Sequence, residues 1–560
     1  MKKMSKVQQI NRRDFVKLFG LASGGILLGC NISSDKKDFL PKVDGTFTPN
    51  LFVQIQKDGN IVLLASRSEM GQGIKTSLAS AIADELEADW KYITVKQATG
   101  NAKYGNQNTD GSRSVRTLLV PMRKMGATAK MMLISAAAKK WNISEDACKA
   151  ENHYVINKVS NDKIFYGDLV DEASKVSIPS EKNIKLKKVE DFKYIGKTLK
   201  SVDLKDFTHG TATYGIDVRI PNMKFAAIAR CPVTFGTVKS FDKTKAEKIA
   251  GVETIFELEK MSPPIGKFFG ALGGVAVIAN NTWAAFQGKL ALDIKWNYGE
   301  NKDFNSVEFT KKLTERVHEN GKLVPGSSGE INFKDVDKIV EATYHVPFLA
   351  HSPMEVPNAT AWFQNNKIEV WAPVQDPQTA RSEIAHFFNV DEENVTVNVT
   401  FLGGGFGRRL HTPNGIQAAV LSKAVGKPVK CFFSRKEEFQ NDTFRPPTHH
   451  VLKAKLNSEG LIEALEHNVS SGDVAFGSPM LPSIAEPLLG ADLGAWRGGM
   501  IQYCAIPNYR TVSWRQKLPF ATSWWRSLGL LANTFAVESF MDELAVAAKM
   551  NPVEFRLAQI

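Results

Sequence analysis

A run of glycines followed by two arginines is the feature of this sequence best suited to bind an anion. Valines alternate along residues 394–402, and then come three glycines at 403–405, Phe406, Gly407 and the pair Arg408 and Arg409. Glycines reach φ > 0 and leave N–H groups uncovered, so successive amides can point into one concavity. The guanidinium groups add forked donors with fixed charge. Taken alone, the triplet more often marks a plain turn beside a solvated basic pair.

A second glycine loop, EMGQG at residues 69–73, follows a predicted strand and opens a predicted helix. A helix N-terminus can bind an anion through its free N–H groups and its dipole. The same sequence also suits a plain strand-to-helix turn. Lys75 and Thr76 follow Gly73, so the loop does not complete GxGxxG, and neither glycine loop matches GxxxxGK[ST]. The nucleotide-binding folds marked by those motifs are therefore not indicated.

Two further polar side chains are candidate ligand-binding residues only if they lie close to these glycine loops. Gln375 follows a proline-stiffened strand end, where its amide could face a ligand. Arg526 follows two tryptophans and precedes a Ser-Leu-Gly turn, so we expect a partly buried cation that needs a counter-anion. Each is more often structural when taken singly. His449 and His450 are adjacent, and neighbours on a strand point to opposite faces, so we interpret them as surface residues and not as a metal pair.

Periodicity predicts the elements that position these residues. Residues 51–66 alternate on both sides of an Asp-Gly turn, which predicts a β-hairpin. Apolar residues recur every four positions over 74–86, which predicts a helix directly after the EMGQG loop. A second amphipathic helix is predicted over about 122–141. Residues 190–300 read as one compact α+β unit, in which Asn281 caps a helix.

The N-terminus has the features of an export signal. Arg12 and Arg13 precede Phe15, Lys17 and a glycine-diluted apolar run that is too short to span a bilayer, and Cys30 ends the run. The stretch resembles a twin-arginine signal with a lipoprotein box, in which Cys30 becomes the lipidated first residue. We therefore expect a periplasmic protein tethered to the membrane through a lipid. The alternative is an ordinary basic N-terminus.

Charge and cysteines exclude several classes of protein. The net charge of the 560-residue chain is +12, and about +7 remains without residues 1–29, with no run of five like charges. Nucleic-acid binding is therefore not indicated. None of the five cysteines is in a CxxC pair, so we expect no zinc ribbon and no iron–sulfur cluster in this chain, but buried single thiols.

Together the motifs resemble one family. The segments EMGQG, HGTATYGIDVRIPNMKF, HSPMEVPNATA, WAPVQDPQ, FLGGGFGRRL, AIPNYR and WWRSLG occur in the order seen in the large molybdenum subunit of the xanthine oxidase family. The resemblance is closer to the isoquinoline 1-oxidoreductase β-subunit branch and its aldehyde-oxidising relatives, in which EMGQG precedes the hammerhead domain. It covers residues from about 50 to 560.

The resemblance implies a fold and a division of the chain. The fold is an α+β, multi-domain molybdopterin-binding domain with an inserted α/β hammerhead domain. The division is a signal over 1–30, a linker over 31–48, a first molybdopterin-binding segment over 49–185, the hammerhead domain over 190–300 and the main molybdopterin-binding segment over 301–560.

The resemblance also implies a cofactor, a molybdenum ion held by a pyranopterin, expected as molybdopterin cytosine dinucleotide. By position it places these residues around that cofactor: Gly404, Gly405, Phe406 and Gly407 near the metal's oxo group and the pterin phosphate, Gln375 near the apical oxygen, Gln72 and Gly73 on the pyrophosphate, and Arg526 near the cofactor or the substrate. No side chain is expected to ligate the metal. A cofactor inserted in the cytoplasm requires export after folding, which agrees with a twin-arginine signal.

By resemblance the chain is a molybdopterin-dependent oxidoreductase that oxidises an N-heterocycle or an aldehyde with oxygen from water. Its electrons would leave through a [2Fe-2S] small subunit. No carboxylate here matches the family's base glutamate; Glu355 holds another motif position and is interpreted as structural. We assign no catalytic residue and expect a chain truncated at its C-terminus, or completed by a second chain. The alternative hypothesis is a non-catalytic exported lipoprotein with a remnant pocket that binds a ligand or a partner.

Overall fold

The computed structural model describes most of the chain after residue 45. The described residues are 46–259, 273–324, 328–333, 339–411, 413–474, 492, 503, 505–519, 522 and 524–560. The predicted export signal, including Arg12, Arg13 and Cys30, lies outside them. Within these ranges no helix is long and apolar enough to cross a membrane. Cys148, Cys231 and Cys431 are buried free thiols, as expected.

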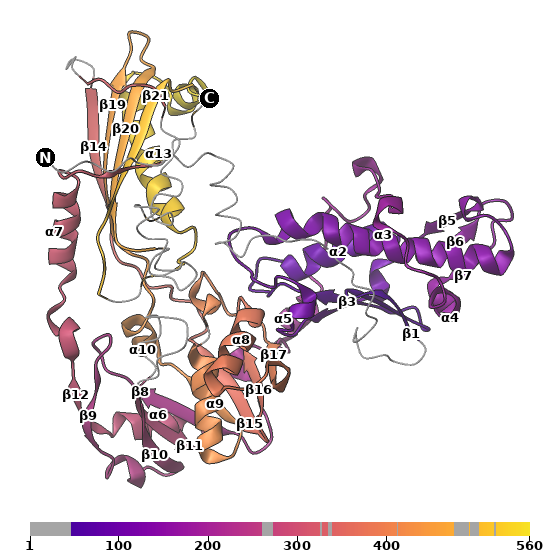
Figure 1. The fold of residues 1–560 in the computed structure, drawn as a ribbon, viewed down its shortest axis with the longest axis horizontal. Helices are drawn as coiled ribbons and strands as arrows, with labels where there is room; N and C mark the ends of the chain where they lie inside the picture. The colour runs from indigo at the N-terminus through magenta and orange to yellow at the C-terminus, as the bar shows by residue number, and fades with distance from the viewer. Residues whose placement is uncertain are drawn as a thin grey trace, which may run out of the picture.

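The first unit is a four-stranded sheet with two long helices packed on it (Figure 1). The strands β1 to β4 are neighbours in chain order and span Thr46–Asn50, Val53–Gln56, Ile61–Ala65 and Ile93–Gln97. The predicted hairpin is confirmed as β2 and β3, with Gly59 at φ 87° in its turn. Helix α2, Ile74–Leu86, begins where the four-residue repeat begins, as predicted.

Helix α3 spans Ser114–Trp141 and packs along α2. It begins well before the predicted start near residue 122. Pro121 lies inside it, and a proline removes one helical hydrogen bond, so the sequence alone favours a start after the proline. Leu118 and Met122 are buried in the core of the first unit, and this packing retains the turns before and around Pro121.

A seven-stranded sheet forms the centre of the remaining chain, in the order β10-β11-β8-β18-β15-β16-β17. In that order the strands span Val252–Leu258, Gly274–Ala279, Lys224–Ala229, Val429–Phe432, Asn358–Gln364, Lys367–Ala372 and Val395–Val399. β8 pairs in parallel with β18, so the unit predicted over 190–300 shares its sheet with later residues.

Helices cover this central sheet. Helix α6, Thr282–Leu290, begins at the predicted cap, because Asn281 Oδ1 accepts a hydrogen bond of 2.8 Å from Ala284 N. Helices α8, Pro377–Phe388, and α9, Pro413–Val425, pack beside β15, β17 and β18. A ribbon of β9, Thr237–Asp242, and β12, Asp293–Asn297, extends from the same region.

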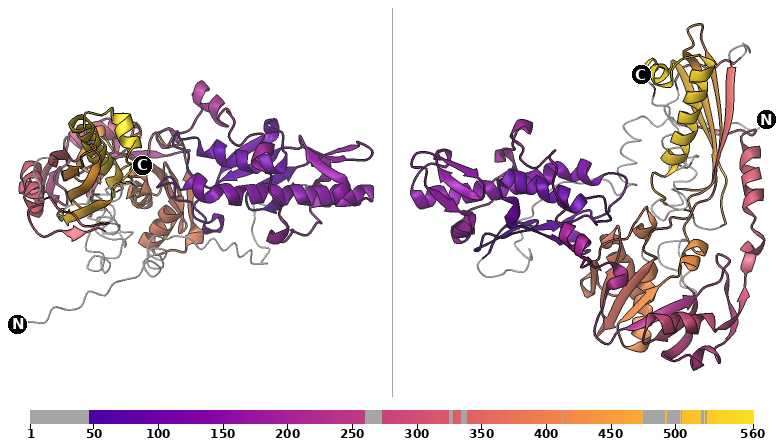
Figure 2. Two further views of the ribbon diagram at one scale, coloured as in Figure 1. Left: turned by 90° about the horizontal axis from the view of Figure 1, so that it is seen from above. Right: turned by 180° about the vertical axis from the view of Figure 1, so that it is seen from behind.

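A five-stranded sheet in the order β13-β21-β20-β19-β14 forms the third part. In that order the strands span Lys322–Leu323, Asn508–Arg515, Ile462–Ser471, Thr448–Leu456 and Ile339–Val346. Helices α13, Gly529–Ala547, and α7, Ser306–Arg316, lie on opposite sides of it (Figures 1 and 2). The last helix, α14, spans Pro552–Leu557 and packs against α13.

The first unit stands to one side and approaches the rest of the chain beside α8 and β17, which Figure 1 labels (Figures 1 and 2). Two loops of the first unit, before α2 and before α3, therefore lie against the loops that follow β16 and β17. Both predicted glycine loops are in this region, and the fold brings them together from distant parts of the sequence.

Candidate functional site

Hydrogen bonds join loops from both sides of this contact. Ser68 Oγ donates to Val374 O at 2.7 Å, and Thr109 N donates to Gln375 O at 2.9 Å. Leu402 N donates to Glu69 O at 3.3 Å. The EMGQG loop, the loop before α3, the end of the WAPVQDP segment and the GGGFG loop therefore meet at one place. We call this place the loop junction.

The side chain of Gln375 joins two loops of the loop junction by hydrogen bonds. Its side chain is buried, with 3% exposure. Nε2 donates to Thr109 O at 2.9 Å, and Oε1 accepts from Gly407 N at 3.0 Å and from Arg409 N at 3.3 Å. Both ends of the carboxamide are therefore engaged by the chain, and Gln375 acts by fixing the shape of the GGGFG loop.

The GGGFG loop offers three successive N–H groups. Gly404 and Phe406 have φ of 97° and 56°, and Gly407 has φ of 104°. The N–H groups of Gly404, Gly405 and Phe406 donate to no acceptor in the described part of the chain. Amides left free in a turn with positive φ form an anion-binding concavity. The predicted chemistry of this loop therefore has a geometric basis.

Close packing opposes a side chain at several glycines of the loop, and two of them face the EMGQG segment or the tryptophan segment. A Cβ on Gly407 would lie 1.4 Å from Trp524 O. A Cβ on Gly405 would lie 2.7 Å from both Met70 Sδ and Gln375 Oε1. The loop is thus enclosed by the EMGQG segment on one side and by the tryptophan segment on the other.

Glu355 anchors the start of the GGGFG loop. Its Oε2 accepts from Gly403 N at 3.0 Å, while Oε1 accepts from Ile216 N at 3.0 Å and from Asn358 Nδ2 at 2.8 Å. Arg409 Nη2 donates to Glu355 O at 2.6 Å and lies 3.5 Å from Oε2. Glu355 therefore has a structural role, because its carboxylate joins its own segment to the segments that contain Ile216 and Gly403.

The arginine pair is neither solvated nor directed at an open anion site. Arg408 and Arg409 are 6% and 5% exposed. Arg408 Nε lies 2.8 Å from Asp442 Oδ1, and Asp442 also accepts from His351 N at 2.6 Å. Burial opposes ionisation of Asp442, but His351 and Arg408 outweigh it and lower the pKa of Asp442 to about 2. Arg408, Asp442 and His351 form a buried ionic support behind the GGGFG loop.

The EMGQG loop is organised by its own glutamate. Glu69 Oε1 accepts from Gly71 N at 2.9 Å and from Gly73 N at 3.0 Å, and Oε2 accepts from Lys75 N at 3.0 Å. Gln72 folds back in the same way, since Nε2 donates to Ser68 O at 2.9 Å and Oε1 accepts from Met70 N at 2.7 Å. Much of the anion-binding capacity expected at this helix start is therefore used internally.

Arg526 differs from its expectation. It is exposed, not partly buried, and its guanidinium lies 5.4 Å from the Phe406 ring centroid and 5.9 Å from that of Trp525. Trp525 Nε1 donates to Ala350 O at 3.2 Å and fixes this segment. Within the described ranges Arg526 is held by aromatic faces and not by a carboxylate. The structure thus brings Arg526 to the GGGFG loop with its charge open to a ligand.

Sequence reasoning missed the loop before α3, residues 105–113. Arg67 extends from the end of β3 into it and donates through Nη1 to Asn106 Oδ1 at 3.0 Å. Burial and the neighbouring Arg113 lower the pKa of Arg67 to about 10. Three buried polar atoms here have no hydrogen-bond partner within the described residues: Arg67 Nε, Gln107 Oε1 and Asn108 Oδ1. The usable signal was a Gly/Asn-rich run ending in Gly-Ser at a helix start.

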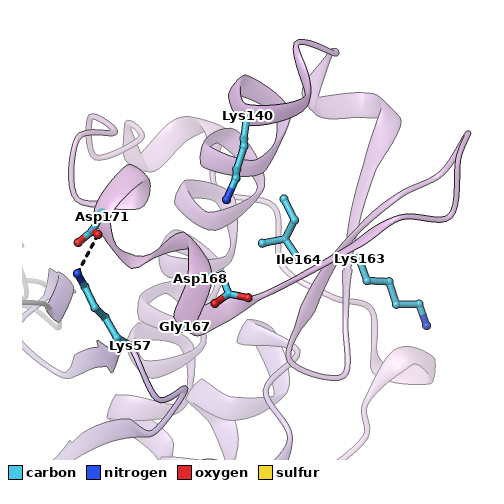
Figure 3. Close-up of a pocket in the computed structure, with 7 residues that line it drawn as sticks. All are labelled: Lys57, Lys140, Lys163, Ile164, Gly167, Asp168 and Asp171. Carbon is cyan, nitrogen blue, oxygen red and sulfur yellow. Dashed lines mark ion pairs between the residues drawn. The ribbon is translucent and has the colours of Figure 1, made fainter.

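A separate hollow of about 470 Å³ opens on the first unit (Figure 3). The residues that line it are Lys57, Lys140, Lys163, Ile164, Gly167, Asp168 and Asp171. Lys57 and Asp171 form an exposed ion pair at 2.9 Å across part of it. It contains none of the predicted site residues, and its open, polar walls suit solvent, so we place the functional site at the loop junction.

The chain is similar to known molybdopterin-binding proteins. Two family models, each described as a molybdopterin cofactor-binding domain, match residues 1–221 and 310–560. The chain is 29% identical over 568 residues to the membrane-bound aldehyde dehydrogenase (pyrroloquinoline-quinone) of Gluconacetobacter polyoxogenes, with 98% of this chain and 72% of the relative covered. It is 25% identical over 610 residues to the isoquinoline 1-oxidoreductase β subunit of Brevundimonas diminuta, with 99% and 75% covered.

Among solved structures, quinoline 2-oxidoreductase from Pseudomonas putida 86 shares the fold. The TM-score is 0.50 at 20% identity, over 63% of this chain and 48% of that one. The expected α+β, multi-domain fold is confirmed by this likeness together with the mixture of sheets and helices. Its motifs, its matched domain models and its fold thus agree, and the chain belongs to the molybdopterin-binding large subunits of the xanthine oxidase family.

Proposed function

We propose that this chain is the large subunit of a molybdenum hydroxylase that oxidises an aldehyde or an N-heterocycle with oxygen from water. The observation that carries the proposal is the loop junction, where two glycine loops and Gln375 meet a third, polar loop. Relatives named aldehyde dehydrogenase, isoquinoline 1-oxidoreductase and nicotinate dehydrogenase support both substrate classes.

The residues at the loop junction fit a large polar cofactor. Arg67, Gln107 and Asn108 each hold a buried polar atom without a partner in the described chain, and such atoms are rare unless a ligand or water satisfies them. Space is also left free in the described part of the chain, because a Cβ added at Gly71 or Gly73 would meet no described atom within 4 Å. A ligand rich in phosphate and amide groups satisfies both observations.

The cofactor supplies the two-electron redox chemistry when bound. This chain's residues would hold and orient it. Gly404, Gly405 and Phe406 would donate through N–H groups that bind no described acceptor, and Gly407 and Gln375 would shape that loop. Gln72 and Gly73 would border it at the helix start, because their own donors bind Ser68 and Glu69, and Arg526 would contribute its exposed charge. Phe406 is partly exposed and presents an apolar edge beside Arg526. This edge would exclude water on the side where a flat substrate binds.

We extend the proposal to the form of the cofactor and to partners. The cytosine dinucleotide form follows from the branch that the motifs resemble. A [2Fe-2S] small subunit would accept the electrons, because the five cysteines of this chain contain no CxxC pair. Export by the twin-arginine route with a lipid on Cys30 follows from residues 11–30.

The test is purification of the full chain with a co-expressed small subunit. We expect about one molybdenum per chain by mass spectrometry of the metal, cytidine monophosphate after acid hydrolysis, and aldehyde-dependent dye reduction. A metal-free complex with bound quinone would contradict the molybdenum cofactor and would favour pyrroloquinoline quinone, the cofactor in the name of the Gluconacetobacter relative. A folded, cofactor-free monomer would instead favour the non-catalytic lipoprotein. One observation supports that alternative: the side chains of Glu69 and Gln72 bind neighbouring backbone groups and not an external ligand.

A separate experiment tests the route of export. Replacement of Arg12 and Arg13 by lysine should leave the chain in the cytoplasm, and Cys30→Ala should release it from the membrane fraction. Membrane-bound chain in both variants would contradict the proposed localisation without touching the proposed reaction.

A further inference from the structure

Three polar side chains form a row across one face of the five-stranded sheet. The register pairs His345 of β14 with His449 of β19, and His449 with Ser470 of β20. Residues directly opposite each other on neighbouring strands point to the same face. Leu452 and the alternate residues after it pack with α13, so the row lies on the other face, where α7 lies. The expectation that His449 and His450 are surface residues is wrong, since both are buried.

The two rings stand at a chelating distance. His345 Nδ1 and His449 Nδ1 lie 3.2 Å apart, and the ring centroids are 4.5 Å apart. A tetrahedral Zn²⁺ with Zn–N bonds of about 2.0–2.1 Å holds two imidazole nitrogens about 3.3 Å apart. Small rotations of the rings therefore let one ion bind both nitrogens without movement of the strands.

The surroundings provide both rigidity and access. His449 is 2% exposed, whereas His345 lies at the solvent-facing side of the edge strand β14. The pair therefore combines one enclosed ring, that of His449, with one ring that solvent can reach.

A further polar group in the row has no hydrogen-bond partner in the described part of the chain. Ser470 Oγ is buried and makes no hydrogen bond within the described residues. An unpaired buried hydroxyl costs free energy unless a water, an ion or a ligand occupies the space beside it. His318 follows the C-terminal end of α7 and is the next imidazole on this side of the sheet.

We propose that His345 and His449 bind a divalent transition metal ion of the Zn²⁺, Ni²⁺ or Cu²⁺ type, with water and Ser470 on its remaining sides. Imidazole is a preferred ligand for these ions. The described residues contain no group of three or more His, Cys, Asp or Glu ligands, so this site has two protein ligands and open positions. The ion would pin the edge strand β14 to β19.

The site differs from a pairing of His449 with its sequence neighbour. His450 points to the α13 face and lies 3.0 Å from His467 Nε2 through its Nδ1, fully enclosed. That second pair has no solvent path, so a metal ion cannot reach it without opening the core. The cross-strand partner, and not the adjacent residue, decides which histidine can take a ligand.

Calorimetric titration tests the proposal on the full chain, purified without a polyhistidine tag. NiCl₂ and ZnCl₂ are the probes, in a buffer that does not bind metals, at pH 7.5. We expect about one ion per chain and a higher melting temperature with metal. His345→Ala should weaken binding at least tenfold, and its exposed position leaves the fold intact, as circular dichroism can check.

The matched control is His386→Ala, which removes an exposed single histidine from the last turn of α8. It should bind nickel as the unchanged chain does. Ser470→Ala should weaken binding less than His345→Ala. Absence of saturable binding in the unchanged chain, or equal affinity in the His345→Ala variant, overturns the proposal. Neither result depends on the molybdenum content, so failure here leaves the proposed function standing.

Discussion

The two glycine loops of the loop junction use glycine for different reasons. At Gly71 and Gly73 an added Cβ would meet none of the described atoms within 4 Å, and among the described residues glycine is required there for the positive φ of 94° and 81°. At Gly405 and Gly407 an added Cβ would strike Met70, Gln375 or Trp524 at 2.7 Å or less. The first loop is shaped from within, and the second is shaped by its neighbours.

The anchoring carboxylates differ in the same way. Glu69 binds N–H groups within six residues of itself. Glu355 binds Ile216 and Gly403, which come from distant parts of the sequence. The EMGQG loop can therefore form with α2 alone, whereas the GGGFG loop takes its shape only when the seven-stranded sheet and the tryptophan segment are in place. The predictions below test this contrast.

The largest effect is expected for Gly407→Ala. The new Cβ would lie 1.4 Å from Trp524 O at a φ of 104°, so backbone must move as well as side chain. We expect a loss of about 4 kcal/mol in the free energy of unfolding, or no soluble protein. Urea denaturation of purified protein measures it. A loss below about 1 kcal/mol would show that the neighbours do not enclose this loop.

Glu355→Gln should have the next largest effect. The amide nitrogen would face an N–H donor, and buried Arg409 would lose its carboxylate, so we expect a loss of about 3 kcal/mol. Glu69→Gln is the matched variant in the other loop, and we expect a loss of about 1 kcal/mol because two of its three donors, Gly71 N and Gly73 N, are only partly buried. Equal losses in the two variants would remove the contrast between the loops.

Acid should destabilise the region around the GGGFG loop through protonation of His411. Burial, followed by Arg408 and His351, lowers the pKa of His411 to about 3, against about 6.5 in an unfolded chain. The contribution of the neutral ring is complete above pH 6.5 and falls as the pH drops toward 3, so at pH 5 about 2 kcal/mol is lost. Thermal unfolding between pH 7.5 and 5 should show it. His411→Gln should reduce the pH-dependent loss by about 2 kcal/mol and leave the part that comes from the buried His449 and His450, while His386→Gln should leave the pH dependence unchanged.

The smallest effect is expected for Gly71→Ala. Only the left-handed backbone opposes the new methyl group, so we expect a loss of about 1 kcal/mol and a small decrease in melting temperature. The same preparation should keep its cofactor content. A loss as large as that of Gly407→Ala would mean that the EMGQG loop is also enclosed.

The sequence predicted best what local periodicity controls. The hairpin of β2 and β3, helix α2 and the Asn281 cap formed where their residues indicated, because each depends on neighbours within a few positions. The glycine loops could be identified as candidate anion sites for a similar local reason, because glycine has no side chain to cover its own N–H group. Their meeting place followed only from the family resemblance.

Side-chain direction was beyond the sequence. Arg408 and Arg409 are buried and paired with Asp442 and Glu355, which come from loops elsewhere in the sequence. No residue near the arginines in the chain indicates these partners. Gln375 turns toward the chain and not toward a ligand. The loop before α3 was missed because its role depends on a contact between distant residues. Arg67, just after β3, donates a hydrogen bond to Asn106 in this loop, and the sequence does not show that the two are neighbours.

The parallel pairing of β8 with β18 has a consequence for synthesis. β8 ends at Ala229 and β18 begins at Val429, so about 200 residues separate the two partners. At roughly 5–20 residues per second, a ribosome delivers the second partner about 10–40 s after the first. During that interval one side of the nascent sheet shows an open row of backbone donors and acceptors, which is a template for aggregation that a chaperone must shield.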